Sequence, residues 1–337
     1  MIGVELHWWI SNKMSRYIHI TPQSTPTATY AAIQNALGTG DSVCLDPGVF
    51  DINYWPMYRA PGQMIVGAGR GDSSGAAITK VNYVGPAGGK ILTLYDGVQH
   101  YSHCSLENVL LNGNGLANVG IMGHDDISAV GCANFSARNV TIIGVNYGVN
   151  PTNVYLGVLR PEVGAFAHNF NFHNFHMYGG GYGFWGKGEP HTLSGGCTIQ
   201  GQVLAGVRAE VGARLSLGDT TFSANGWDID AYNAQQISAF GAWFEESTQG
   251  VYRAQTAHSV DLLASLFHTN NAAYIMELGS SAGRHNFSGR VADSTHSSLI
   301  INVNPSATGR IDTIGTYPLR ATYAVSGDPV PMQVLNT

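Results

Sequence analysis

Charged residues are scarce in this chain, and several that could act together lie close in sequence. Asp, Glu, Lys and Arg make up 11% of the 337 residues. The segment of interest contains Arg208, Glu210, Asp228, Asp230, Glu245 and Glu246. Glycoside hydrolysis uses two carboxyl groups about 5 to 9.5 Å apart. A neighbouring carboxylate raises the pKa of one of them, as a general acid requires. We therefore predict that these six residues include the catalytic groups of a hydrolase.

Alternation of residue types predicts where these side chains point. In residues 207–211 and 227–231, apolar and charged residues alternate as in a half-buried strand, so the charged side chains should all point outward. Strands on consecutive coils, about 4.8 Å apart, would then bring the two segments together. The alternative is a solvated charge ladder, in which Arg208 pairs with Asp228 or Asp230 and catalyses nothing.

The same residues also permit a lyase. β-Elimination from a uronic acid needs a base and a cation that neutralises the sugar carboxylate, and Arg208 or Arg253 could serve. Aspartates would then hold Ca²⁺, whereas hydrolysis needs no cofactor. Because no tight group of three acidic ligands is evident, we place hydrolysis slightly ahead of elimination and predict no metal site.

An aromatic stretch between positions 166 and 191 is the second candidate site. Rings stack on the apolar faces of sugars, and His or Lys side chains bind their hydroxyl groups. The predicted substrate contacts are Tyr182, Trp185, Lys187, His176, Trp243 and Arg253. By contrast, we expect the alternating Phe170 and Phe172 to be core residues of a strand.

The elements that would position these residues form a repeat without helical periodicity. Short strand-like segments separated by Gly, Asn and Ser recur every 18 to 35 residues from about Leu106 onward. Phe222, Phe244 and Phe267 are 22 and 23 residues apart, so they should stack inside successive coils. A unit of one coil cannot bury its own apolar face and must stack on a copy of itself. The pattern predicts an all-β protein, a single-stranded right-handed parallel β-helix.

A short helix should close the N-terminal end of this solenoid. Tyr30–Leu37 is predicted to be helical, with Thr27 or Thr29 as its cap and Gly38 as its stop. Ile33 and Leu37 lie on one face of it and could plug the apolar cross-section.

The order of three motifs carries a family resemblance. Residues 32–37 read Ala-Ile-Gln-Asn-Ala-Leu, residues 43–50 contain Val-x-Leu-x-Pro-Gly-Val-Phe, and residues 65–69 read Ile-x-Gly-Ala-Gly. This order resembles the N-terminal cap of the pectate-lyase-like β-helix superfamily. That superfamily contains polysaccharide lyases, glycoside hydrolases, sugar epimerases and phage tailspike depolymerases. One departure is that Thr27–Tyr30 replaces the acidic residue usually found before the helix.

The resemblance implies a protein that binds and cleaves an extracellular polysaccharide, most specifically a phage tailspike depolymerase that forms a homotrimer. The cap carries no catalytic residue, so the resemblance alone does not identify the reaction. A non-catalytic adhesin on the same scaffold is the main alternative, and an epimerase is a third. We expect a lead over residues 1–23, a cap with the first coils over 24–84, a β-helix body over 85–316 and a C-terminal cap or tail over 317–337.

Composition excludes several other classes. The net charge is −6 and there is no basic run, so the electrostatic footprint of a nucleic-acid-binding protein is missing. The cysteines Cys44, Cys104, Cys132 and Cys197 form no C-x-x-C motif, which argues against zinc and favours buried thiols. No signal peptide or membrane-spanning stretch is recognisable, so we expect an extracellular or virion-associated protein.

Overall fold

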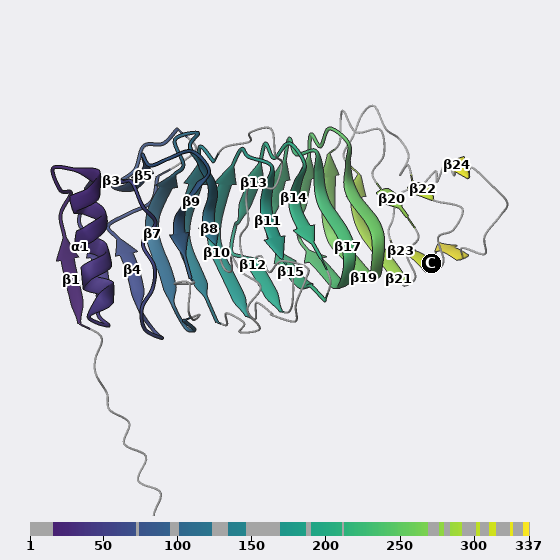
Figure 1. Ribbon diagram of the computed structural model, residues 1–337. Coiled ribbons are helices and arrows are strands. Elements are labelled where there is room, and N and C mark those ends of the chain that lie inside the picture. The colour runs from purple at the N-terminus through teal and green to yellow at the C-terminus, as the bar shows by residue number, and fades with distance from the viewer. Residues whose placement is uncertain are drawn as a thin grey trace, which may run out of the picture.

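The computed structural model shows a long solenoid of parallel strands with one helix at its N-terminal end (Figure 1). It describes residues 16–71, 74–94, 101–122, 134–145, 169–186, 190–210, 212–268, 276–279, 284–291, 301–303, 310–314, 324–325 and 333–336. No helix among these residues is long and apolar enough to cross a membrane. The predicted right-handed parallel β-helix is confirmed.

Each coil passes through three sheet faces, which we call the first, second and third face in the order in which the chain visits them. The first face contains β1 (Tyr17–Ile20), β2 (Ser42–Leu45), β4 (Met64–Gly67), β12 (His191–Ser194), β15 (Arg214–Gly218), β23 (Arg310–Ile314) and β25 (Gln333–Asn336). The second contains β3 (Gly48–Ile52), β5 (Thr79–Tyr83), β13 (Thr198–Gln200), β16 (Thr221–Ser223) and β18 (Trp243–Glu245).

The third face contains β6 (Gly89–Thr93), β8 (Ala117–Met122), β11 (Tyr182–Gly186), β14 (Ala205–Ala209), β20 (Met276–Leu278), β22 (Ile301–Val303) and β24 (Ala324–Val325). Longer strands turn a corner and join more than one face. These are β7 (Ser105–Asn112), β9 (Ser136–Ile143), β10 (Phe170–Tyr178), β17 (Trp227–Phe240), β19 (Gly250–His268) and β21 (Arg284–Val291).

The core is a continuous column of inward-facing side chains. Phe170 and Phe172 are buried, as expected, and Phe222 stacks on Phe244 with ring centroids 5.2 Å apart and planes 9° from parallel. Phe267 is in register with Phe244 on the next coil, which agrees with the predicted spacing. Consecutive coils therefore bury the apolar face that a single coil cannot bury alone.

The cap helix α1 (Pro26–Gly38) begins earlier than the sequence suggested. Its N-cap is Thr25, which accepts a hydrogen bond from the Ala28 amide at 3.2 Å, and Pro26 occupies the first turn, where no amide donor is needed. Ile33 and Leu37 are buried against the first coils, as predicted. β1 lies within the segment expected to be an irregular lead, and it pairs in parallel with β2.

The cysteines agree with the expectation of free thiols where the structure describes them. Cys104 and Cys197 are buried and Cys44 is partly buried, and all three are unbridged. Cys132 lies outside the described residues.

Candidate functional site

The candidate site is a row of residues that consecutive coils place side by side on the third face. The register of β11, β14, β17, β19 and β20 aligns Trp185, Arg208, Asp230, Arg253 and Glu277. Opposite charges therefore alternate from one coil to the next. The sequence analysis predicts two separate sites, one at the aromatic stretch and one at the charged residues. In the structure, Tyr182 and Trp185 of the aromatic stretch contact the guanidinium of Arg208.

Arg208 is the centre of this row. Its Nη1 donates to Asp230 Oδ2 at 2.6 Å, and its Nε donates to Glu210 Oε1 at 2.9 Å. The guanidinium carbon also lies 5.9 Å from the ring centroid of Tyr182, 5.3 Å from that of Trp185 and 5.4 Å from that of Tyr232. Three rings and two carboxylates thus surround one cation.

Arg253 repeats this arrangement one coil further along. Its Nε and Nη2 donate to the two carboxylate oxygens of Asp230 at 3.0 and 2.9 Å, a bidentate pair. Its guanidinium lies 5.3 Å from the ring centroid of Trp227. Gln255 adds a longer hydrogen bond to Asp230 at 3.4 Å. We call these residues the arginine cluster: Arg208, Arg253, Glu210, Asp230, Tyr182, Trp185, Trp227 and Tyr232.

The surroundings of the two arginines in the arginine cluster keep both side chains protonated. Burial alone lowers the pKa of Arg208, but the carboxylates of Asp230 and Glu210 outweigh it and leave the pKa raised. Burial likewise lowers the pKa of Arg253, and its bonds to Asp230 again raise it overall. A guanidinium with a raised pKa releases its proton less readily, so neither arginine is suited to be the base of an elimination.

Asp228 is where the predicted orientation is wrong. The alternation rule placed it outside with Asp230, but its side chain is completely buried. Asp228 accepts hydrogen bonds from Asn225 Nδ2, at 3.0 Å, and from the Ser247 hydroxyl. Burial is the main reason that its pKa rises to about 7. Both partners are themselves buried, so Asp228 belongs to the interior, whereas Asp230 and Glu210, which are also buried, pair with the arginines of the third face.

Asp228 points inward because the chain turns a corner between the second and third faces just before this residue. Gly206 is the neighbour of Asp228 on the preceding coil, and a Cβ on Gly206 would lie 2.8 Å from the buried ring of Phe222. Asp228 and the next residue, Ile229, are both buried, so the strict alternation of a straight strand fails where the chain bends.

The remaining predicted residues lie away from the arginine cluster. Glu245 and Trp243 are on β18 of the second face, and Glu246 is exposed at the turn that follows. Within the described residues, these three side chains make no hydrogen bond, ion pair or ring contact with Arg208 or Asp230. Lys187 lies outside the described residues.

His176 also belongs to the second face. Its Nε2 is 2.9 Å from Asn174 Oδ1, which in turn accepts a hydrogen bond from Arg70 at 3.0 Å. Burial, helped by the positive charge of Arg70, lowers the pKa of His176 to about 4, so the ring is neutral at pH 7. Its ring stacks on Tyr178 with centroids 6.3 Å apart.

Four residues in or beside the row were not predicted from the sequence: Trp227, Tyr232, Gln255 and Glu277. Tyr232 follows Asp230 by two positions, so alternation could have placed it on the same face. Its partner on the next coil does not follow from the spacing, because the pairing of β17 with β19 shifts register between Ala231 and Tyr232. Trp227 resembled a core residue, and it is in fact almost fully buried.

One group of side chains has the composition of a metal site. The ligand atoms of His19, Cys44 and Asp46 lie within 4.8 Å of one another. His19 Nδ1 and Asp46 Oδ1 are already 3.1 Å apart, as in a hydrogen bond. Burial and the charge of Asp46 raise the pKa of the Cys44 thiol.

Comparison with known proteins places the fold but not the chemistry. No family model matches the chain, and no curated protein matches it. The A-module of an Azotobacter vinelandii mannuronan C-5 epimerase is 12% identical, with a TM-score of 0.51 over 94% of this chain and 96% of that one. The N-terminal fragment of bacteriophage Phi29 gene product 12 is also 12% identical, with a TM-score of 0.51 over 85% of this chain.

The chain spans 63% of that phage fragment. The Dettilon tailspike protein is 10% identical, with a TM-score of 0.50 over 92% of this chain and 68% of that one. These likenesses show that the chain has the fold of a right-handed parallel β-helix.

Proposed function

We propose that this protein binds an extended polysaccharide along its third face, at the arginine cluster. The observation that carries the proposal is the surrounding of Arg208 by three rings and two carboxylates. Rings offer flat apolar surface to a sugar, and ionised groups beside them offer hydrogen bonds to its hydroxyl groups. Two arginines and two carboxylates leave the cluster without net charge, which suits a polymer of neutral or weakly charged sugars.

The solenoid adds a reason to expect a polymer. Consecutive coils repeat at about 4.8 Å, so a linear ligand can meet one coil after another. Two proteins of similar fold, a mannuronan C-5 epimerase and a tailspike protein, also support the proposal that the ligand is a polysaccharide. On this basis we also propose a homotrimer located on a virion or outside the cell.

Hydrolysis is the reaction we place first. Glu210 and Asp230 both accept hydrogen bonds from Arg208, so their carboxyl groups lie on either side of one guanidinium. Glycoside hydrolases use a pair of carboxyl groups about 5 to 9.5 Å apart. Glu210 accepts one hydrogen bond from Arg208, whereas Asp230 is held by both arginines, so we assign proton transfer to Glu210 and charge stabilisation to Asp230. Elimination with bound Ca²⁺ ranks second because the pKa values of both arginines are raised.

A non-catalytic adhesin is the second candidate function. The ion pairs that favour a stable sugar platform also neutralise the carboxylates that hydrolysis would use. Under this alternative the arginine cluster binds the polymer and releases it unchanged.

The deciding experiment begins with the purified protein and capsular, lipopolysaccharide, pectic, alginate and fructan polymers. Binding, reducing-end release and the ultraviolet absorbance of unsaturated products are measured in parallel. New reducing ends without absorbance indicate a hydrolase, and both signals together indicate a lyase. Binding without either signal indicates the adhesin.

The site itself is tested with Tyr232→Ala. The Tyr232 side chain is 44% exposed and contacts Arg208, so its loss should weaken binding about three- to tenfold. Tyr17→Ala is the matched control, since Tyr17 is 45% exposed on the first face. Equal affinity of Tyr232→Ala and the unmodified protein would remove the arginine cluster as the binding site.

A further inference from the structure

A recurring pair of side chains marks the third face well beyond the arginine cluster. Among the described residues, every cation–π contact lies on this face. In three of them, a tryptophan on one coil is covered by a cation from the next coil. The pairs are Trp55 with Lys90, Trp185 with Arg208, and Trp227 with Arg253. The first pair lies near the cap helix and plays no part in the site described above.

The place of Trp55 on the third face follows from the path of the chain. The turn after each second-face strand leads into the third face, as from β5 to β6, from β7 to β8 and from β10 to β11. The segment after β3 takes the same course, because Met57 bridges in parallel to Thr93 at the end of β6. Trp55 thus occupies the first coil of the face that carries Trp185.

The two tryptophans are four coil steps apart. Second-face strands pair in the order β3, β5, β7, β9 and β10, so the coils that carry the two tryptophans are the first and the fifth of this series. At about 4.8 Å per coil, this separation is roughly 19 Å.

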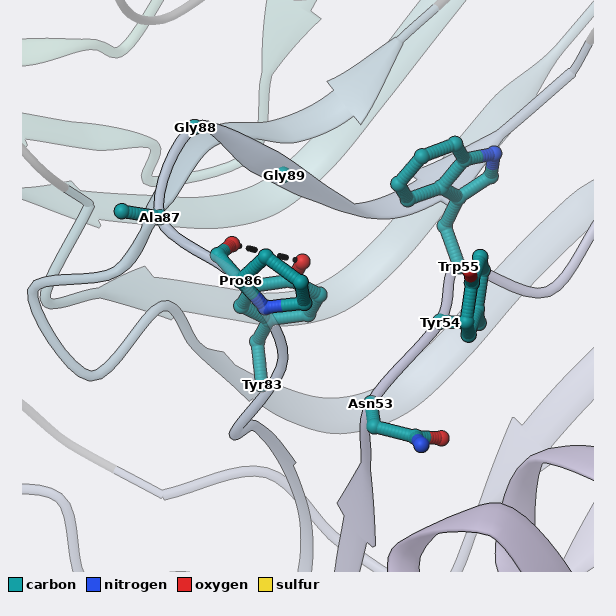
Figure 2. Close-up of a pocket in the computed structure, with 8 residues that line it drawn as sticks. All are labelled: Asn53, Tyr54, Trp55, Tyr83, Pro86, Ala87, Gly88 and Gly89. Carbon is teal, nitrogen blue, oxygen red and sulfur yellow. Dashed lines mark hydrogen bonds between the residues drawn. The ribbon is translucent and has the colours of Figure 1, made fainter.

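Beside Trp55 the surface is hollowed. The hollow has a volume of about 200 Å³ and is lined by Asn53, Tyr54, Trp55, Tyr83, Pro86, Ala87, Gly88 and Gly89. In Figure 2 the rings of Tyr54 and Trp55 stand on one side, Tyr83 and Pro86 on the other, and the backbone of Gly88 and Gly89 runs across the top. The rings of Tyr54 and Trp55 are 5.7 Å apart.

The walls of the hollow are held in place by the surrounding structure. Asn53 Nδ2 donates to the Thr27 hydroxyl at 2.9 Å, which ties the hollow to the cap helix. The Tyr83 hydroxyl donates to the Pro86 carbonyl at 2.9 Å, so its oxygen still has lone pairs to accept a hydrogen bond. Gly89 is required here, because a Cβ at that position would overlap the Tyr83 hydroxyl. The site is therefore preformed, which reduces the entropy cost of binding.

We infer that this hollow is a second saccharide subsite, which takes one sugar ring of the same polymer that the arginine cluster binds. The inference rests on the proposed function for the identity of the polymer. The lining contains rings and amide groups but no ionised side chain, with Lys90 only at the Trp55 face, so it matches a sugar ring rather than an anion. One strand of polymer would then contact both the hollow and the arginine cluster.

The first test uses single sugars and does not depend on finding the polymer. Saturation-transfer NMR is recorded with methyl glycosides of glucose, galactose, mannose, N-acetylglucosamine and glucuronate. The proteins are unmodified, Trp55→Ala, Tyr232→Ala and the control Tyr17→Ala. We expect at least one glycoside to show a signal that Trp55→Ala abolishes and that Tyr232→Ala and Tyr17→Ala retain. Thermal unfolding checks that each variant remains folded.

The outcomes separate the subsite from the proposed function. A signal lost only in Tyr232→Ala overturns the subsite and leaves binding at the arginine cluster intact. A signal lost only in Trp55→Ala supports the subsite, and the arginine cluster is then judged separately by the effect of Tyr232→Ala on polymer binding. If no glycoside gives a signal that depends on Trp55, the hollow is not a saccharide site, whatever the cluster binds.

The second test uses chain length on any polymer that the screen retains. Trp55→Ala should weaken binding of the long polymer about three- to tenfold. It should leave unchanged the affinity of the arginine cluster, measured as the binding that Tyr232→Ala removes, for an oligosaccharide too short to span roughly 19 Å, four coil steps at about 4.8 Å each. An equal effect of Trp55→Ala on short and long ligands would contradict a single strand running between the two sites.

Discussion

At the scale of single residues, two aspartates two positions apart have opposite environments. Asp230 is nearly inaccessible to water, yet two arginines hold its carboxylate. Asp228 is equally buried but has only neutral hydrogen-bond donors, Asn225 and Ser247. Burial without a cation disfavours the charged form, which is why the pKa of Asp228 is raised to about 7.

The raised pKa of Asp228 makes stability depend on pH. The folded protein keeps this proton up to about pH 7, whereas the ordinary pKa of an aspartate in an unfolded chain is 3.8. The folded state therefore binds more protons between these values, and this carboxyl destabilises the fold increasingly as the pH rises through that window. Above about pH 7 the loss is complete and constant.

Asp228→Asn should remove that loss. The amide stays neutral at every pH and can still bond to Asn225 and Ser247. We expect the variant to gain stability relative to the unmodified protein between about pH 4 and pH 7, on the order of a few kcal/mol. Urea unfolding at several pH values measures this difference. Parallel stability curves for the two proteins would mean that Asp228 ionises in the fold as it does in water.

At the scale of elements, the corner between the second and third faces sets the backbone conformation just before the strands that carry the site. Gly179, Gly201, Ala224 and Glu246 follow one another at this corner on successive coils, each with a φ between 51 and 72°. The amide of each of the first three donates to a carbonyl of the next coil, as from Ala224 to Glu245 at 3.0 Å. The chain must therefore adopt the left-handed conformation here, whether or not the residue is glycine.

Ala224→Gly should accordingly stabilise the protein. An L-residue in the left-handed region costs about 1 to 2 kcal/mol, part of which is offset by the greater freedom of glycine in the unfolded chain. We expect a net gain of about 0.5 to 1 kcal/mol in the free energy of unfolding, read from chemical denaturation. Ala231→Gly, inside strand β17, is the control and should destabilise by about 1 kcal/mol. A loss of stability in Ala224→Gly would show that the corner does not strain alanine.

At the scale of the whole molecule, strand pairing joins only neighbouring coils, so each end needs its own cover. α1 provides this cover at the N-terminal end by placing Leu37 and Ile33 over the first coils. In a solenoid, stability is close to a sum of terms for each coil and its neighbours. Damage to the cap should therefore loosen the nearest coils first.

Leu37→Ala tests this locality. Removing a fully buried leucine side chain should cost about 2 to 5 kcal/mol. We expect faster hydrogen exchange in β1, β2 and β3, with β17 and β19 unchanged. Asn35→Ala, on the exposed side of the same helix, should leave exchange as it is. Uniformly faster exchange along the whole solenoid would indicate that it opens as one cooperative unit instead.

The sequence by itself determined the fold because the fold depends on local patterns. Spacing of 22 and 23 residues between Phe222, Phe244 and Phe267 measures one coil directly, and the cap motifs lie within a continuous stretch of chain. The strand Ser42–Leu45 and the buried positions of Phe170 and Phe172 could be predicted from residue alternation and composition alone. Each coil has the same local pattern of short strands and turns.

Only the tertiary structure decided which side chains meet. Trp185 and Arg208 are 23 positions apart in sequence, and their contact depends on the exact length of the coil between them. Asp228 turned inward because the chain bends at a corner that alternation cannot reveal. The first-coil position of Trp55 on the same face followed from the course of the whole solenoid. Stacking of coils converts small differences in coil length into the register of side chains, and that register is a property of the assembled solenoid.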